Sequence, residues 1–165
     1  MTRGVAAAAA GTLAMDLVWY GRYRRGGGTD PFVDWELSTT TKDWEHAGAP
    51  AQMGRRIVKR VFKVELPDEA AGWTNDVVHW ATGGQWGAVY GLVAGSAGAN
   101  PLCGAVLGIV ACSAAYVVLP LAKLYKPIWQ YDLVTLAKDY SAHLVFGTVT
   151  GGAFWALTRK GLSPS

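Results

Sequence analysis

The amino-acid sequence predicts an all-α, polytopic membrane protein with four transmembrane helices and a cytoplasmic amphipathic helix in its long first loop. Three observations support this class. Hydrophobic residues make up 51% of the 165 residues and charged residues only 16%, whereas about 25% is typical of charged residues in a soluble domain. The apolar residues gather in four nearly uncharged segments, at about 4–21, 76–97, 101–122 and 140–158. Glycines recur at four-residue spacing in these segments, which is typical of helices that pack closely in a bilayer.

The first apolar segment, residues 4–21, is rich in alanine and short for a span of about 20 residues. A basic start and an alanine-rich core also fit a secretory signal peptide. However, the segment ends in Trp19-Tyr20, and three arginines follow within five residues. Aromatic and basic residues in this order are typical of a helix end at the membrane–water interface. We therefore expect a first transmembrane helix, within a single membrane domain that covers residues 1–165.

The long loop that follows is predicted to carry one amphipathic helix, at about residues 50–66. Met53, Ile57 and Val61 share one face of this helix. Basic residues line the rest of it: Arg55, Arg56, Lys59, Arg60 and Lys63. Two compatible interpretations stay open. The helix lies on the anionic headgroups of a bilayer, or it packs on the ends of the membrane helices with its basic residues in solvent.

The second span is the segment around which we expect the chain to be organised. It carries Gly83, Gly87, Gly91 and Gly95 at strict four-residue spacing. In water each glycine would weaken a helix by roughly 1 kcal/mol relative to alanine, but in lipid the backbone has no other hydrogen-bond partner and the helix persists. The glycines then form a groove for the backbone of another helix. The third and fourth spans each carry two glycines at the same spacing, which predict similar contacts: Gly104 and Gly108, and Gly147 and Gly151.

Two prolines mark the ends of the third span. A tight turn precedes it, with Asn100 as the expected N-cap and Pro101 as the first helical residue. Pro120 is expected to bend or end the helix. Beyond it, Lys123, Lys126 and neighbouring aromatic residues form an interfacial belt.

The distribution of Lys and Arg predicts the orientation. The first loop holds nine of these residues and the third connection three, against three on the opposite side, which accounts for all 15. The positive-inside rule then places the long loop in the cytoplasm and both termini outside.

Three ionisable residues lie inside the predicted spans: Asp16, His79 and His143. In the predicted topology all three fall in one layer near the cytoplasmic surface. A charge at the centre of a spanning helix costs about 2.5–3.5 kcal/mol on insertion scales and less near the helix end. We therefore expect Asp16 to have a partner, and a histidine is the most available one.

Three roles for this layer stay open. In the first, Asp16 accepts a hydrogen bond from His79 or His143 and the layer is a polar clasp that fixes helix register. In the second, the same residues form a transport or proton-relay site. In the third, His79, His143 and Asp16 bind a metal ion, joined by Asp76 or Asp139. Asp139 precedes His143 by four residues and so could orient its imidazole ring.

The second and fourth spans share the pattern H-x3-G-x3-G-x2-aromatic, which begins at His79 and at His143. With the small-residue first helix, the long loop, the third helix ending at Pro120 and a last helix opening with Ser141-Ala142-His143-Leu144-Val145, the order of features resembles the YagU-like uncharacterised bacterial inner-membrane proteins. The resemblance covers the membrane spans. It implies a four-helix protein of the bacterial inner membrane, and it implies no activity.

The sequence shows no arrangement typical of a soluble enzyme. Residues 26–28 are three glycines without the Lys-Ser/Thr ending of a phosphate-binding loop, and Ser141 beside His143 lacks a third orienting group. The net charge of +3 is too small to indicate a nucleic-acid partner, and no cofactor is expected.

We therefore expect a non-catalytic packing or accessory module, in contact with anionic lipid headgroups, that self-associates or binds a larger membrane complex through its glycine faces. The alternative is a small transporter, or an ion or proton conduit, that uses Asp16, His79 and His143.

Overall fold

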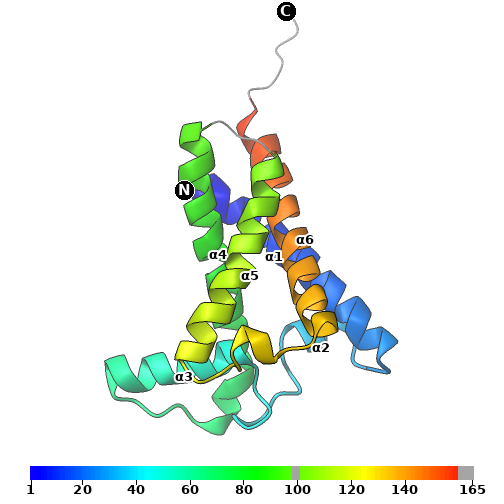
Figure 1. Ribbon diagram of the computed structural model, residues 1–165. Coiled ribbons are helices and arrows are strands. Elements are labelled where there is room, and N and C mark those ends of the chain that lie inside the picture. Colours follow the sequence, from blue (N-terminus) through cyan, green and yellow to red (C-terminus); the bar gives the residue numbers. More distant parts are fainter. Residues whose placement is uncertain (98–100, 160–165) are drawn as a thin grey trace, which may run out of the picture. The chain divides into compact units, whose positions relative to one another are not determined.

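The computed structural model describes residues 1–97 and 101–159, and within these residues every regular element is helical. The prediction of an all-α protein is confirmed. Four helices are long (Figure 1): α1 (Thr2–Arg25), α4 (Ala71–Ala97), α5 (Pro101–Leu121) and α6 (Leu133–Thr158). The others are shorter: α2 (Phe32–Glu36), α3 (Ala49–Phe62) and the 3₁₀ turns Asp68–Ala70 and Ile128–Gln130.

Local sequence signals explain where the helices end. After α1, Gly27 adopts a left-handed conformation with a φ of 96°, and the backbone N–H of Gly26 donates to the carbonyl of Arg22, as in a glycine C-cap. In α5, Pro120 lies one residue before the helix ends, as expected. The predicted N-cap, Asn100, lies outside the described residues.

The helices contribute to two compact units. Unit 1 comprises Met1–Met15, Gly83–Cys112 and Ala137–Ser165, and unit 2 comprises Asp16–Thr82 and Ser113–Leu136. Each of the four long helices therefore supplies residues to both units. The long loop between α1 and α4 belongs to unit 2.

Close backbone contacts at glycines build unit 1. A Cβ atom at Gly87 would overlap the Cβ of Ala8, and one at Gly91 would lie 3.1 Å from the Cα of Gly4. Similarly, a Cβ atom at Gly104 would overlap the carbonyl oxygen of Gly147. Within unit 1, α4 thus packs on α1, and α5 on α6, at distances that only small residues allow.

Burial in unit 1 differs from that of a typical water-soluble protein, although a few large residues such as Phe146 and Phe154 are buried. Its buried positions are mostly small, including Ala7, Ala8, Thr12, Ala94, Ala111, Ala142 and Thr150. Large aliphatic side chains face outward: Val93, Leu102 and Val106 are 63%, 77% and 59% exposed. In soluble proteins valine and leucine are among the residues most often buried.

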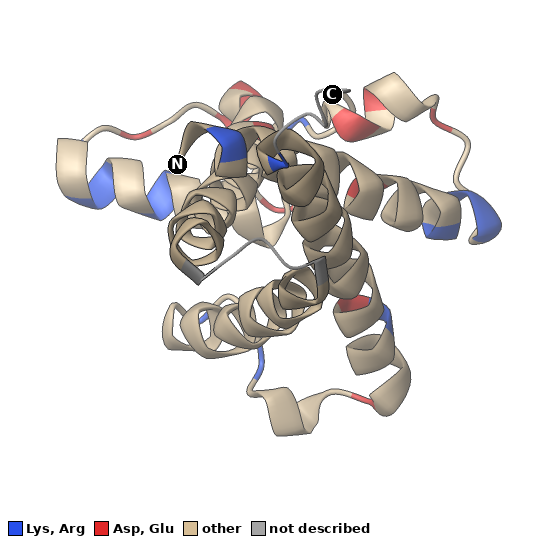
Figure 2. Cartoon of the chain, turned by 90° about the horizontal axis from the view of Figure 1, so that it is seen from above, with Lys and Arg blue, Asp and Glu red and all other residues tan. Residues whose placement is uncertain are grey.

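Of the described helices, α5 alone is long and apolar enough to cross a membrane, over Leu102–Leu121 with a mean hydropathy of 2.3. The other long helices are less apolar by this measure, and they carry polar or charged residues such as Asp16, Gln85 and Lys138. Most of each long helix carries neither acidic nor basic residues (Figure 2). Hydropathy by itself therefore does not support the predicted four-span topology.

Unit 2 has a small core of its own around Trp44, Ala51, Ala70 and Ala71. Helix α3 joins it through its small residues, because Gly54 faces α4 so closely that a Cβ there would lie 2.6 Å from the side chain of Thr74.

The guanidinium of Arg56 on α3 also donates a hydrogen bond to the carbonyl of Ala122, just after α5. The predicted apolar face of α3 is not the packed one, since Ile57 and Val61 stay exposed.

Candidate functional site

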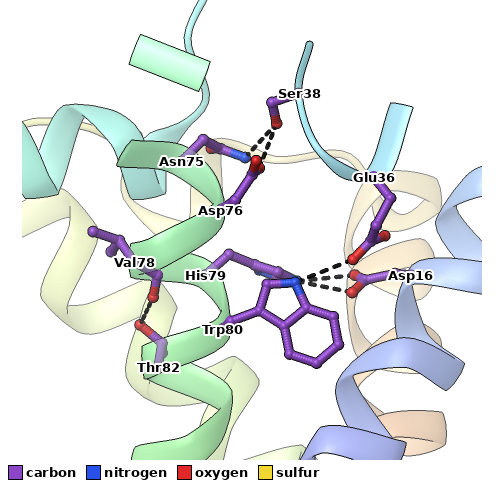
Figure 3. Close-up of polar contacts among 9 residues, drawn as sticks. All are labelled: Asp16, Glu36, Ser38, Asn75, Asp76, Val78, His79, Trp80 and Thr82. Atoms are coloured by element: carbon purple, nitrogen blue, oxygen red, sulfur yellow. Dashed lines mark hydrogen bonds and ion pairs between the residues drawn. The ribbon is translucent and has the colours of Figure 1, made fainter. Parts of the chain in front are cut away.

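The centre of the candidate site is the carboxylate of Asp16 on α1, which is only 4% exposed. Its partner is His79 on α4, whose Nε2 lies 2.9 Å from Oδ1 and 3.1 Å from Oδ2 of Asp16 (Figure 3). Because an ionised carboxylate is only an acceptor, the ring N–H donates to it. The pair joins two helices whose residues are 63 positions apart in sequence.

A second carboxylate, that of Glu36 at the end of α2, approaches the same place (Figure 3). It accepts a hydrogen bond of 3.1 Å from the indole N–H of Trp80, the residue after His79. Burial, and then the negative charge of Asp16, raise the pKa of Glu36 above its ordinary value of 4.5.

A polar rim surrounds this centre. The hydroxyl of Ser38 donates to Oδ1 of Asp76 at 2.7 Å, and the amide of Asn75 donates to the Ser38 oxygen at 3.1 Å. Gly72 lies so close to the Ser38 carbonyl that a Cβ there would be 2.6 Å away. These contacts attach the chain after α2 to the first turns of α4.

Aromatic rings hold α2 beside the end of α1. Tyr20 meets Phe32 edge-to-face, with ring centroids 5.1 Å apart, and lies 5.5 Å from Trp35. The hydroxyl of Tyr23 donates to Oδ2 of Asp30 at 2.8 Å. This cluster presents Glu36 to Asp16 and His79.

Together these elements of unit 2 line an open cleft of about 780 Å³. Four carboxyl groups line it, those of Asp16, Asp30, Glu36 and Asp76, together with the cationic or titratable side chains of Arg22 and His79. The side chain of His79, which is 28% exposed, can therefore be reached from this cleft, whereas Asp16 is almost fully covered.

The predicted layer of ionisable residues divides between the two units. His143 and Asp139 belong to unit 1, where Nδ1 of His143 lies 2.9 Å from the carbonyl oxygen of Asp139. The ring thus donates to the backbone of its own helix, and this bond does not use the carboxylate that was expected to orient it.

Within residues 1–97 and 101–159, no group of three or more His, Cys, Asp or Glu side chains lies close enough together to hold a metal ion.

The predicted glycine positions mostly meet a neighbouring helix within unit 1. A Cβ at Gly83 would overlap the hydroxyl of Thr12, and one at Gly108 would overlap the carbonyl of His143. Gly151 lies against Gly104, whereas no atom of another segment among residues 1–97 and 101–159 lies within 4 Å of a Cβ built at Gly95.

The aromatic residues that end the two matching patterns, Tyr90 and Phe154, touch each other edge-to-face at 5.5 Å.

No protein-family model, curated protein or solved structure matches the chain. The resemblance to the YagU-like proteins therefore stays a prediction.

Sequence reasoning missed the contact of Ser38 with Asn75 and that of Glu36 with Trp80. Both belong to an interaction between the long loop and α4, which helical periodicity does not reveal. One signal was available: Glu36 stands between two apolar residues, Trp35 and Leu37, in the long loop. The contacts of Trp35 with Tyr20 and Phe32 bring the neighbouring carboxylate close to α1.

Proposed function

We propose that the protein is an integral protein of the bacterial inner membrane, that α1, α4, α5 and α6 all span the bilayer, and that its role is non-catalytic. The observation that carries this proposal is the burial pattern of unit 1, with small residues inside and large aliphatic residues outside. Membrane helices pack through small residues because lipid chains are as apolar as leucine side chains. In water the same surface would leave many large aliphatic side chains in contact with solvent, and large exposed apolar patches mark membrane or protein interaction sites.

The surface of α5 gives the strongest single support. Only 33% of its apolar stretch is buried, whereas the core helix of a soluble protein would be mostly covered by other segments. It also lies in the middle of the chain, where a signal sequence does not occur. The exposed side chains recur along its length: Leu102, Val106, Ile109, Val110, Val117, Val118 and Leu121.

Helix α3 supports the cytoplasmic placement of the long loop. Its exposed apolar residues Ile57, Val61 and Phe62 accompany five basic residues on and just after the same helix. Exposed apolar and basic side chains on one helix favour the interface of a bilayer with anionic headgroups.

The accessory role requires a face for a partner. The glycines Gly83, Gly87 and Gly91 already face α1 within unit 1, so a second copy or another membrane protein would meet the aliphatic face of α5.

The cysteines of α5 can test whether copies of the protein pair through this helix, because Cys103 is exposed and Cys112 is buried. If copies pair through α5, mild oxidation of the membranes should yield a dimer that the Cys103→Ser variant does not form. A monomer under these conditions, with no partner retained after mild solubilisation, contradicts the accessory role.

Extraction of membranes at alkaline pH tests the integral placement. We expect the protein to stay in the pellet after carbonate treatment and to need detergent for release. A peripheral protein held only by α3 would be released by carbonate, and that result would overturn the proposal.

A second candidate function is an ion or proton conduit, and one observation favours it. The Asp16–His79 pair lines an open cleft, and ionisable residues in membrane helices often mark ion or proton pathways. Proteoliposomes should then show proton or ion flux that is lost in Asp16→Asn and in His79→Ala. Flux no greater than that of protein-free liposomes would exclude this candidate.

A further inference from the structure

The cleft of unit 2 carries negative charge in a chain that is positive overall. Its four carboxyl groups outnumber its cationic side chain, Arg22, and its histidine, although the whole chain has a net charge of +3. Several of the carboxylates have neutral hydrogen-bond donors: Tyr23 donates to Asp30, Ser38 to Asp76 and Trp80 to Glu36. Such bonds orient a carboxylate without cancelling its charge.

Aromatic rings form much of the remaining wall. Trp19, Tyr23, Trp35 and Tyr125 all line the cleft. Ring faces attract cations through their quadrupole, most strongly on tryptophan. Trp19 already holds a cation in this way, because the guanidinium carbon of Arg22 lies 4.7 Å from its ring centroid. The walls therefore suit a positively charged organic group.

The arrangement of the carboxylates distinguishes an organic cation from a metal ion. They come from different elements, α1, α2, α4 and the segment before α2. In the part of the chain that the structure describes, no three acidic, histidine or cysteine side chains converge as ligands. A Ca²⁺ or Mg²⁺ ion needs several oxygen ligands around one point. A molecule with separated positive charges needs only one carboxylate near each.

We propose that this cleft binds an aliphatic di- or polyamine, with its ammonium groups beside the carboxylates and its methylene chain against the aromatic rings. The volume of about 780 Å³ lies within the range of small-molecule sites. The proposal does not depend on the number of membrane spans or on conduction, because all lining residues belong to unit 2 and binding is measured at equilibrium.

Titration of the full-length protein in a non-ionic detergent tests the proposal. Spermidine and putrescine are added while heat and tryptophan fluorescence are recorded, since Trp19 and Trp35 line the cleft. We expect saturable binding that weakens as salt is added, because salt screens charge pairs near solvent.

Glu36→Gln and Asp76→Asn remove a charge but keep the shape and a hydrogen-bond acceptor. Each should raise the Kd for spermidine by about tenfold, as expected for the loss of one charge-assisted hydrogen bond. Asp43→Asn is the matched control: Asp43 is a loop carboxylate that does not line the cleft, and the affinity should not change. Thermal melts of each variant establish that it is folded.

Three outcomes would overturn the proposal. The first is no saturable binding of either amine to the folded protein. The second is an equal loss of affinity in Asp43→Asn, which would mark a general attraction of cations to the surface. The third is displacement of spermidine by Mg²⁺ at equal concentration, which would mark a site for inorganic cations.

Discussion

At the scale of single residues, the hydrogen bond between Asp16 and His79 is the side-chain contact whose loss we expect to lower the stability of the fold most. Removing one partner of a buried ionic pair costs about 3–5 kcal/mol, because the other group is left buried and uncompensated. Asp16→Asn keeps an acceptor for His79, whereas Asp16→Leu removes it. We expect Asp16→Leu to lower the Tm of the purified protein clearly more than Asp16→Asn. Equal losses would show that Asp16 contributes only packing.

The raised pKa of Glu36 predicts how the stability of the folded protein changes with pH. Burial first, and then Asp16, raise the pKa of Glu36 above 4.5. A carboxyl group whose pKa is raised by folding stabilises the folded state below its unfolded pKa, and this contribution is lost as the pH rises through the folded pKa. Glu36→Gln stays neutral, so its Tm should fall less than that of the wild type as the pH rises from about 4.5 towards neutrality.

Asp132 provides a control of opposite sign for this measurement. The hydrogen bonds from the side chain and backbone of Thr135 lower the pKa of Asp132. Its contribution is present above the unfolded pKa and is lost as the pH falls. Asp132→Asn should therefore change the pH dependence in the opposite direction from Glu36→Gln. Identical pH profiles for the wild type and Glu36→Gln would contradict the assignment of Glu36.

At the scale of helices, the glycines of α4 differ in what surrounds them. A Cβ at Gly87 would overlap Ala8 and lie 2.5 Å from the carbonyl oxygen of Gly4, whereas a Cβ at Gly95 meets no atom of the described segments within 4 Å. Overpacking of this kind typically costs about 1–3 kcal/mol, and alanine otherwise favours a helix by up to about 1 kcal/mol over glycine. Gly87→Ala should lower the Tm in detergent, while Gly95→Ala should leave it unchanged or raise it.

This pair of variants also distinguishes packing within the protein from binding to a partner as the role of the α4 glycines. If Gly95 were the contact for a partner in the membrane, Gly95→Ala would weaken the association without lowering the stability of the monomer. If both variants lowered the Tm equally, the close approach of α1 and α4 would be wrong.

At the scale of the whole molecule, the orientation in the membrane can be tested by labelling. In a background of Cys103→Ser and Cys112→Ser, we compare Thr39→Cys in the long loop with Ser96→Cys near the end of α4. Both positions are exposed. A membrane-impermeant maleimide added to intact cells with a permeable outer membrane should label Ser96→Cys at once. Thr39→Cys should react only after lysis, and the reverse pattern would invert the topology.

Much of the fold is predictable because helix formation is local. The four apolar segments became α1, α4, α5 and α6, and the predicted helix at about 50–66 is α3 at Ala49–Phe62. Hydrogen bonds within a helix join residues four apart, so periodicity, prolines and glycines specify the elements. The expectation of a histidine partner for Asp16 follows from the same kind of argument, since burying a lone carboxylate is unfavourable.

The sequence did not determine which side chains pair with each other, because these pairs join segments that are distant in the chain. His79 and His143 have the same surroundings in the sequence, yet His79 bonds to Asp16 and His143 to the backbone of its own helix. Likewise, α3 packs through Gly54 and leaves its apolar Ile57 exposed, and Glu36 reaches Trp80 across 44 residues. Local propensity carries no information on such pairings, because they depend on which surfaces fit together once the helices have formed.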